Sequence, residues 1–200
     1  LGAVTITSTG TIFLGDDITT NAGAIDISGA VQLMTNDIDI STGTGAAVTF
    51  DSTIDNKASE TARNLTIASG TGDVSLGGAS AHIGTTTAIG NLKVNAESGT
   101  GDITLVGNIG TGEAAGAATV TLGQDDTAIL DFDGTAYNTG AATYTGESIT
   151  LSGDGVSFIT NNLAVEFADG TIVLGDDSNL TIDTDNGEQS SGAGNITIAQ

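Results

Sequence analysis

The sequence predicts an all-β fold, a parallel β-helix or β-solenoid that forms one elongated rod over residues 1–200. Three observations predict it: short segments with a strand-like period of two, near-identical internal repeats, and thirty glycines without a single proline. Apolar residues make up 38% of the chain but aromatic residues only 4%. We therefore expect a narrow core of stacked aliphatic side chains.

Strand-like segments recur along the whole chain, and each alternates β-branched with polar residues. They include residues 3–7, 24–27, 37–40, 65–67, 102–105, 148–151 and 195–198. Turn-forming Gly, Asn, Asp, Ser and Thr separate them, and no window has the periodicity of an amphipathic helix. The missing proline fits interior strands, because proline lacks the N–H that an inner strand donates to its neighbour.

Two pairs of segments are nearly identical. Residues 10–17 return as 170–177 with one difference in eight positions, and residues 69–76 return as 98–105 with only Val/Ile and Ser/Thr exchanges. Such repeats are typical of solenoids, in which each unit covers its apolar face by stacking on the next. We expect about 20–29 residues per coil and roughly seven to ten coils, at ~4.8 Å each.

The two ends of the chain, residues 1–7 and 195–200, have the pattern of interior strands. We therefore expect the stack to be uncapped, and we interpret the chain as a length of a continuous rod or a subunit that becomes one. Residues 55–64 are expected to form an irregular turn, which holds Lys57 and Arg63.

The charge balance limits the possible partners. With 25 acidic against 3 basic residues, the net charge is −22, which opposes binding to nucleic acid phosphates and to anionic membrane surfaces. No run approaches the roughly 20 apolar residues that a membrane helix needs. Since there is no cysteine, disulfides and thiolate metal sites are excluded. We expect no nucleic-acid partner and no membrane insertion.

Several segments resemble those of the long repetitive bacterial exoproteins of the filamentous haemagglutinin type. The resemblance extends loosely over the chain and is carried by residues 23–33, 137–151 and 192–198. It implies a right-handed parallel β-helix that is exported to the cell surface or extracellular matrix of a bacterium. It also implies a role in adhesion, aggregation or biofilm structure, with cell-surface or matrix glycans and proteins as partners.

Acidic clusters in turns are candidate calcium sites, because calcium takes six to eight oxygen ligands and carboxylates two residues apart can converge on one ion. The candidate ligands are Asp183, Asp185, Asn186 and Glu188. This segment is not an EF-hand loop, since its glycine comes one position early. Further acidic pairs are Asp16 with Asp17, Asp125 with Asp126, Asp131 with Asp133, and Asp176 with Asp177. The alternative interpretation is that all these carboxylates are solvated turn residues, so no cofactor is required and calcium is the one candidate ion.

An enzyme is a less favoured interpretation. Paired carboxylates serve glycosidases, but enzymes that act on acidic sugars hold them with basic residues, of which this chain has three. His82, the only histidine, has no nucleophile motif near it and is interpreted as a turn residue. Tyr137, Tyr144, Phe158 and Phe167 are interpreted as core residues and not as a binding platform. We expect no catalytic residues.

Two functional hypotheses follow for a secreted protein. In the first, the chain is a structural and adhesive segment of a bacterial surface or matrix protein. In the second, it is a self-assembling extracellular fibre or sheath subunit that associates with further copies end to end or laterally.

Overall fold

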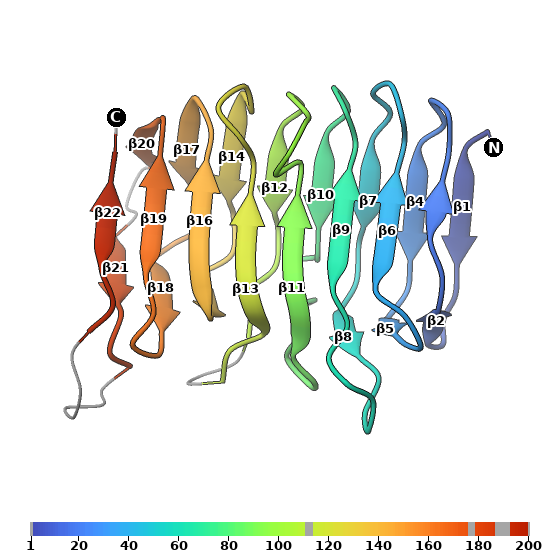
Figure 1. Cartoon of the computed structure of the whole chain (residues 1–200), viewed down its shortest axis with the longest axis horizontal. Helices are drawn as coiled ribbons and strands as arrows, with labels where there is room; N and C mark the ends of the chain where they lie inside the picture. The colour runs from blue at the N-terminus through green and yellow to red at the C-terminus, as the bar shows by residue number, and fades with distance from the viewer. Residues whose placement is uncertain (1, 111–113, 176–178, 187–192, 200) are drawn as a thin grey trace.

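The computed structural model describes residues 2–110, 114–175, 179–186 and 193–199. Within these ranges the protein is all-β and contains no helix. The strands wind into an elongated solenoid with the two chain ends at opposite ends of the stack (Figure 1). The predicted fold class is therefore confirmed.

Three parallel sheets form the sides of the solenoid. Sheet A contains eight strands: β1 (Val4–Thr7), β4 (Ile25–Ser28), β7 (Val48–Phe50), β10 (Val74–Leu76), β12 (Ile103–Leu105), β14 (Ile129–Phe132), β17 (Ser148–Leu151) and β20 (Thr171–Leu174). Sheet C also contains eight: β3 (Ile18–Thr19), β6 (Ile38–Ser41), β9 (Leu65–Ala68), β11 (Ile89–Val94), β13 (Ala117–Leu122), β16 (Ala141–Thr145), β19 (Val165–Ala168) and β22 (Ile196–Ile198). Sheet B has two three-stranded parts: β2 (Ile12–Leu14), β5 (Val31–Leu33) and β8 (Ile54–Asn56), then β15 (Ala136–Thr139), β18 (Val156–Thr160) and β21 (Leu180–Asp183).

Each coil visits sheets A, B and C in turn, so the described strands make about eight coils, within the predicted seven to ten. The first three coils contain three strands each: β1 to β3, β4 to β6, and β7 to β9. Coils 4 and 5 contain two strands each, β10 with β11 and β12 with β13. Coils 6, 7 and 8 again contain three: β14 to β16, β17 to β19, and β20 to β22. In coils 4 and 5 single bridge residues, Ile83 and Ile109, join the two parts of sheet B.

The winding is right-handed. In Figure 1 the strands of sheet C run upward in front, those of sheet A run downward behind, and the chain advances from right to left. This hand is the one strongly preferred when a crossover joins parallel strands of one sheet.

Coil length varies while the register is kept. On sheet A, Val74 pairs with Ile103, 29 positions later, whereas Leu130 pairs with Ile149 after only 19. On sheet C the last step, from Val165 to Ile196, spans 31 positions. The expected range of 20–29 residues was therefore slightly too narrow. Where the extra residues are described, they lie at the corners and do not disturb the ladders.

The two sequence repeats have different structural meanings. Residues 69–76 and 98–105 are successive coils, because Val74 pairs with Ile103 and Leu76 with Leu105. Residues 10–17 and 170–177, in contrast, place β2 in sheet B and β20 in sheet A. The interpretation of residues 10–17 and 170–177 as a structural repeat was wrong. A short apolar strand followed by a glycine turn suits any side of the solenoid, so this similarity does not report the coil period.

The core is aliphatic in the first five coils, apart from Phe50, whereas in coils 6 and 7 five aromatic side chains join the aliphatic ones. All four aromatic residues assigned to the core from the sequence are at most 1% exposed. With Phe132 they form a contiguous cluster, in which the Phe132 ring lies 4.7 Å from Tyr137, 5.0 Å from Tyr144 and 5.0 Å from Phe158. Burial raises the pKa of both tyrosines well above the usual value, so the rings stay neutral.

Glycine at position 84 is required by a close approach between coils. Gly84 has φ +66°, and a Cβ there would overlap the carbonyl oxygen of Gly116 in the next coil. We predict that Gly84→Ala lowers the free energy of unfolding by at least ~3 kcal/mol, because strain from the left-handed conformation adds to overpacking. Chemical denaturation measures this loss.

Gly155→Ala is the matched control. Gly155 also has a positive φ, +74°, but nothing lies within 4 Å of the added Cβ. This variant should lose only ~1–2 kcal/mol, the cost of the backbone conformation. Equal losses in the two variants would show that the coils do not approach closely at Gly84.

Candidate functional site

The described calcium candidates lie at the end of β21 and just after it: Asp183 is the last residue of β21, and Asp185 and Asn186 follow in the turn. Asp183 Oδ1 accepts hydrogen bonds from the backbone N–H of Asp185, at 3.1 Å, and of Asn186, at 2.9 Å. The bond from Asp185 is the main reason that the pKa of Asp183 is below its usual value. Glu188 lies outside the described residues. In the described part of the chain no three acidic or histidine side chains form a metal-binding group, and the calcium hypothesis stays a prediction.

The other acidic pairs have varied surroundings. Asp17 Oδ1 accepts from the backbone N–H of Asp39 at 2.8 Å, and Asp131 Oδ1 accepts from the Ser152 hydroxyl at 2.6 Å. Asp125 and Asp126 are exposed in the turn between β13 and β14. The pair Asp176 and Asp177 lies outside the described residues.

Side-chain acceptors at the corners connect successive coils. Before sheet A, Asp73 Oδ1 accepts from the backbone N–H of Asp102, and Asp102 Oδ1 accepts from that of Ile129, each at 3.1 Å. Before sheet C, Asp37 accepts from the N–H of Asn64 at 2.9 Å, and Asn64 from that of Asn91 at 2.7 Å. We call these side chains corner acceptors: Asp17, Asp37, Asn64, Asp73, His82, Asp102 and Asn108. They give part of the acidic composition a structural role, since four of the 25 acidic residues are among them.

His82 is one of the corner acceptors. Its Nδ1 accepts from the backbone N–H of Asn108 at 3.0 Å, and Asn108 Oδ1 accepts from that of Thr135 at 2.8 Å. His82, Asn108 and Asp133 line a hollow of about 270 Å³. No hydroxyl is hydrogen-bonded to the imidazole within the described ranges, so His82 serves here as an acceptor between coils.

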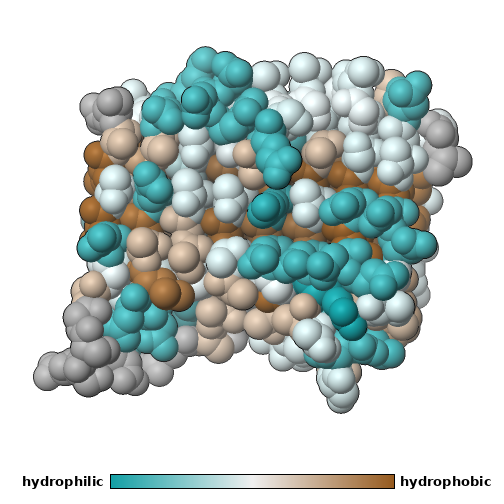
Figure 2. All heavy atoms as spheres, in the orientation of Figure 1, coloured by the Kyte–Doolittle hydropathy of each residue, from teal (hydrophilic) through white to brown (hydrophobic). Residues whose placement is uncertain are grey.

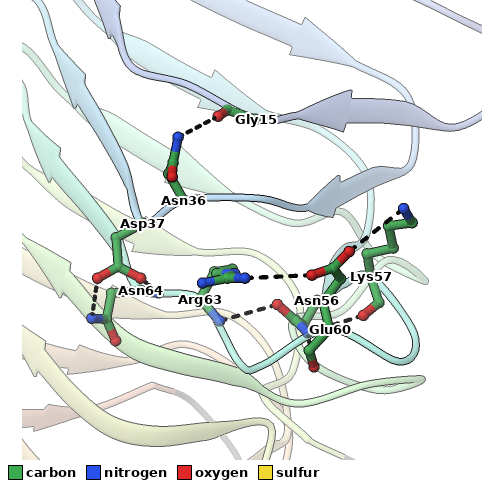
Figure 3. A network of polar contacts seen from close by, with 8 residues as sticks. All are labelled: Gly15, Asn36, Asp37, Asn56, Lys57, Glu60, Arg63 and Asn64. Atoms are coloured by element: carbon green, nitrogen blue, oxygen red, sulfur yellow. Dashed lines mark hydrogen bonds and ion pairs between the residues drawn. The ribbon is translucent and has the colours of Figure 1, made fainter.

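The expected irregular turn projects from the solenoid after β8 (Figure 1). Figure 3 shows how Asn56, which is 1% exposed, closes it. The Asn56 side chain donates to the carbonyl groups of Lys57 and Glu60 and accepts from the N–H of Arg63. The Glu60 carboxylate lies 3.7 Å from Lys57 Nζ and 3.4 Å from Arg63 Nη2. Both cations of the turn are thus paired with one carboxylate.

Lys93, the third basic residue, is exposed on the outer face of sheet C and has no carboxylate within 4.0 Å among the residues that the structure describes. Figure 2 shows hydrophilic side chains gathered on this face over the N-terminal half of the solenoid. Two adjoining hollows, of about 310 Å³ and about 230 Å³, share Asp39, Thr66 and Lys93. We call them together the polar trough; its further lining is Asp37, Asn64, Ile67, Ala68, Asn91, Asn95, Ala96, Glu97 and Ser98.

The trough was not anticipated, although the sequence carries a signal for it. Asp37, Asn64 and Asn91 follow one another at a constant spacing of 27 residues, one coil apart. Their side chains form the first wall, extended by a 2.7 Å bond from the Thr119 hydroxyl to Asn91 Oδ1. The second wall is the turn after β11, where the buried Asn95 bonds to Ser69 in the previous coil at 2.9 Å.

Comparison of the chain with protein-family models, curated proteins and solved structures gives no match. The resemblance to filamentous haemagglutinin-type exoproteins therefore stays a prediction based on sequence segments. In the part of the chain that the structure describes, no helix has the length and apolarity to cross a membrane.

A corner acceptor can be tested at Asn64. Its side chain accepts from Asn91 and donates to Asp37 Oδ2 at 2.8 Å. We predict that Asn64→Ala lowers the free energy of unfolding by ~1–3 kcal/mol, because the N–H of Asn91 loses its acceptor. Denaturant titration gives the value. Asn21→Ala, at an exposed turn residue, is the control and should change stability by less than ~0.5 kcal/mol.

The calcium hypothesis is tested by thermal melting with calcium and with a chelator. If the turn after β21 binds calcium, the midpoint should rise with calcium concentration, because an ion that binds only the folded state stabilises it. Asp185→Asn should abolish the rise, whereas Asp126→Asn, at an exposed turn residue, should leave it intact. An identical midpoint under both conditions removes the hypothesis.

Proposed function

We propose that this chain is a structural and adhesive segment of a secreted bacterial surface or extracellular-matrix protein, with a role in adhesion, aggregation or biofilm. The observation that carries the proposal is the continuity of the three parallel ladders through all eight coils. Such a stack is a stiff spacer, because each coil contacts only its neighbours and the contacts are repeated along the whole axis.

The proposed role is not catalytic. Asp37, Asp73 and Asp102 carry carboxylates of the kind a hydrolase uses, but they accept hydrogen bonds from backbone groups of the next coil. Such carboxylates connect successive coils. This use of the carboxylates supports a scaffold more than a glycosidase.

The surface charge is compatible with a location outside the cell. A net charge of −22 keeps rods apart in dilute solution, whereas salt at physiological strength screens such charges beyond about 8 Å. The same charge argues against partners that present phosphate groups.

Assembly of copies into a fibre or sheath is the second candidate function. In the described stack, coil 8 leaves apolar side chains exposed at positions that are in register with the core: Leu174 is 51% exposed, Ile196 49% and Ile198 52%. Their strands, β20 and β22, are edge strands, whose backbone groups can pair with a coil of the same polypeptide or of another copy.

Deleting one coil tests the spacer function. Residues 69–73 and 98–102 have the same sequence, so removal of residues 74–102 creates no new junction and leaves Val48 opposite Ile103. We predict a folded seven-coil rod that is shorter by ~4.8 Å, because β7 then pairs with β12 and β9 with β13. Circular dichroism and small-angle scattering measure the fold and the length.

Removal of residues 88–102 is the control, because it deletes β11 alone and leaves one coil without a strand in sheet C. This variant should be strongly destabilised. If the whole-coil deletion is equally unstable, the coils are not interchangeable units and the spacer proposal fails. Electron microscopy of the intact chain separates the two functions: single short rods support the spacer, and filaments many rods long support the fibre.

A further inference from the structure

We propose that the polar trough on sheet C binds an uncharged, polyhydroxylated glycan chain. This assigns a ligand class to the proposed adhesive function and rests on that function.

The floor presents hydrogen-bonding groups at regular steps. Asp39 pairs with Thr66, and Thr66 pairs with Lys93, so the three side chains form one outward row across coils 2 to 4. Neighbouring strands place them ~4.8 Å apart. The row offers a carboxylate that accepts, an ammonium group that donates, and a hydroxyl that does both. These groups match a sugar, because each sugar hydroxyl group both donates and accepts hydrogen bonds.

The walls are fixed before any ligand binds. Asn64 is held at both ends of its amide, by Asp37 and by the N–H of Asn91. On the other side, Asn95 is 1% exposed and bonded to Ser69, and this anchors the turn that carries Glu97. A site whose walls are already ordered loses little conformational entropy on binding.

The charges select against anionic glycans. Lys93 is the single cation of the trough, whereas Asp37, Asp39 and Glu97 are acidic. A sulfated or uronic acid chain would meet this excess of negative charge and that of the whole rod. Among the residues that the structure describes, no carboxylate lies within 4.0 Å of Lys93, so its ammonium group is available to donate to a neutral hydroxyl group.

The affinity of one trough should be low. Six of the seven aromatic residues are buried, and the exposed one, Phe13, lies on sheet B. Without an aromatic surface for stacking, we expect a dissociation constant near ~1 mM. Many rods on one cell surface raise the effective affinity by multivalency.

The experiment is an NMR titration of the ¹⁵N-labelled full chain with four hexasaccharides: cellohexaose, maltohexaose, N-acetylchitohexaose and a heparin fragment. We expect at least one neutral sugar to give saturable shifts of the amides of Asp39, Thr66 and Lys93, and the heparin fragment to give none there. Asp39→Ala and Lys93→Ala should each weaken binding about tenfold, the effect of losing one charged hydrogen bond. Both side chains are exposed, so the fold should persist.

Glu166→Gln is the matched control, because Glu166 lies in coil 7 in the same outward row but outside the trough. Its variant should bind like the parent chain. The proposal is overturned if no neutral sugar gives saturable shifts, if the shifts lie elsewhere or survive in both alanine variants, or if the heparin fragment occupies the trough. If solution scattering shows a rod but no sugar binds, only the glycan proposal is refuted. If scattering shows no rod, the spacer proposal is refuted.

Discussion

The structure depends on one constraint: each coil must pair with the previous coil on three sides at once. In a parallel sheet a shift by one residue turns every inward side chain outward, so an error on one side would expose a row of the core. The row Ile27, Phe50 and Leu76 shows the register held through β4, β7 and β10. Since the strands cannot slip, the variation in coil length that the structure describes is confined to the corners.

The corners therefore carry the polar chemistry of the molecule. Where the chain turns, the backbone ladder is interrupted, and an N–H without an acceptor costs ~1–3 kcal/mol. Asp73 and Asp102 supply acceptors at successive positions of one corner, and Asn64 does so at another. Asp and Asn suit this task because their short side chains bond to nearby backbone groups and tolerate turn conformations. The acidic character of the protein is in part a consequence of this need.

The strand pattern was predictable because alternation alone decides which residues face inward. Ile25 and Ile27, chosen from the sequence as strand residues, are fully buried. Coil succession was visible only between residues 69–76 and 98–105, where two corners have the same sequence. Elsewhere coil lengths vary between 19 and 31 residues, and successive coils have no recognisable sequence similarity. The similarity of residues 10–17 to 170–177 was misleading, because these segments lie in different sheets. The aromatic contacts were not predictable either, because Phe132, Tyr137 and Tyr144 belong to three different sheets.

The trough illustrates how a solenoid separates stability from surface chemistry. Its floor residues point away from the core, so Lys93 contributes nothing to the packing of Leu92 and Val94, which are 0% exposed on either side of it. The second wall of the trough exists because the turn after β11 starts at the buried Asn95, whose φ is +47°. A corner can lengthen here while the ladders continue beneath it. This face can therefore acquire a polar site at low cost in stability. A stiff rod presents the site in a fixed orientation, which favours simultaneous binding of weak sites on many rods to one extended ligand.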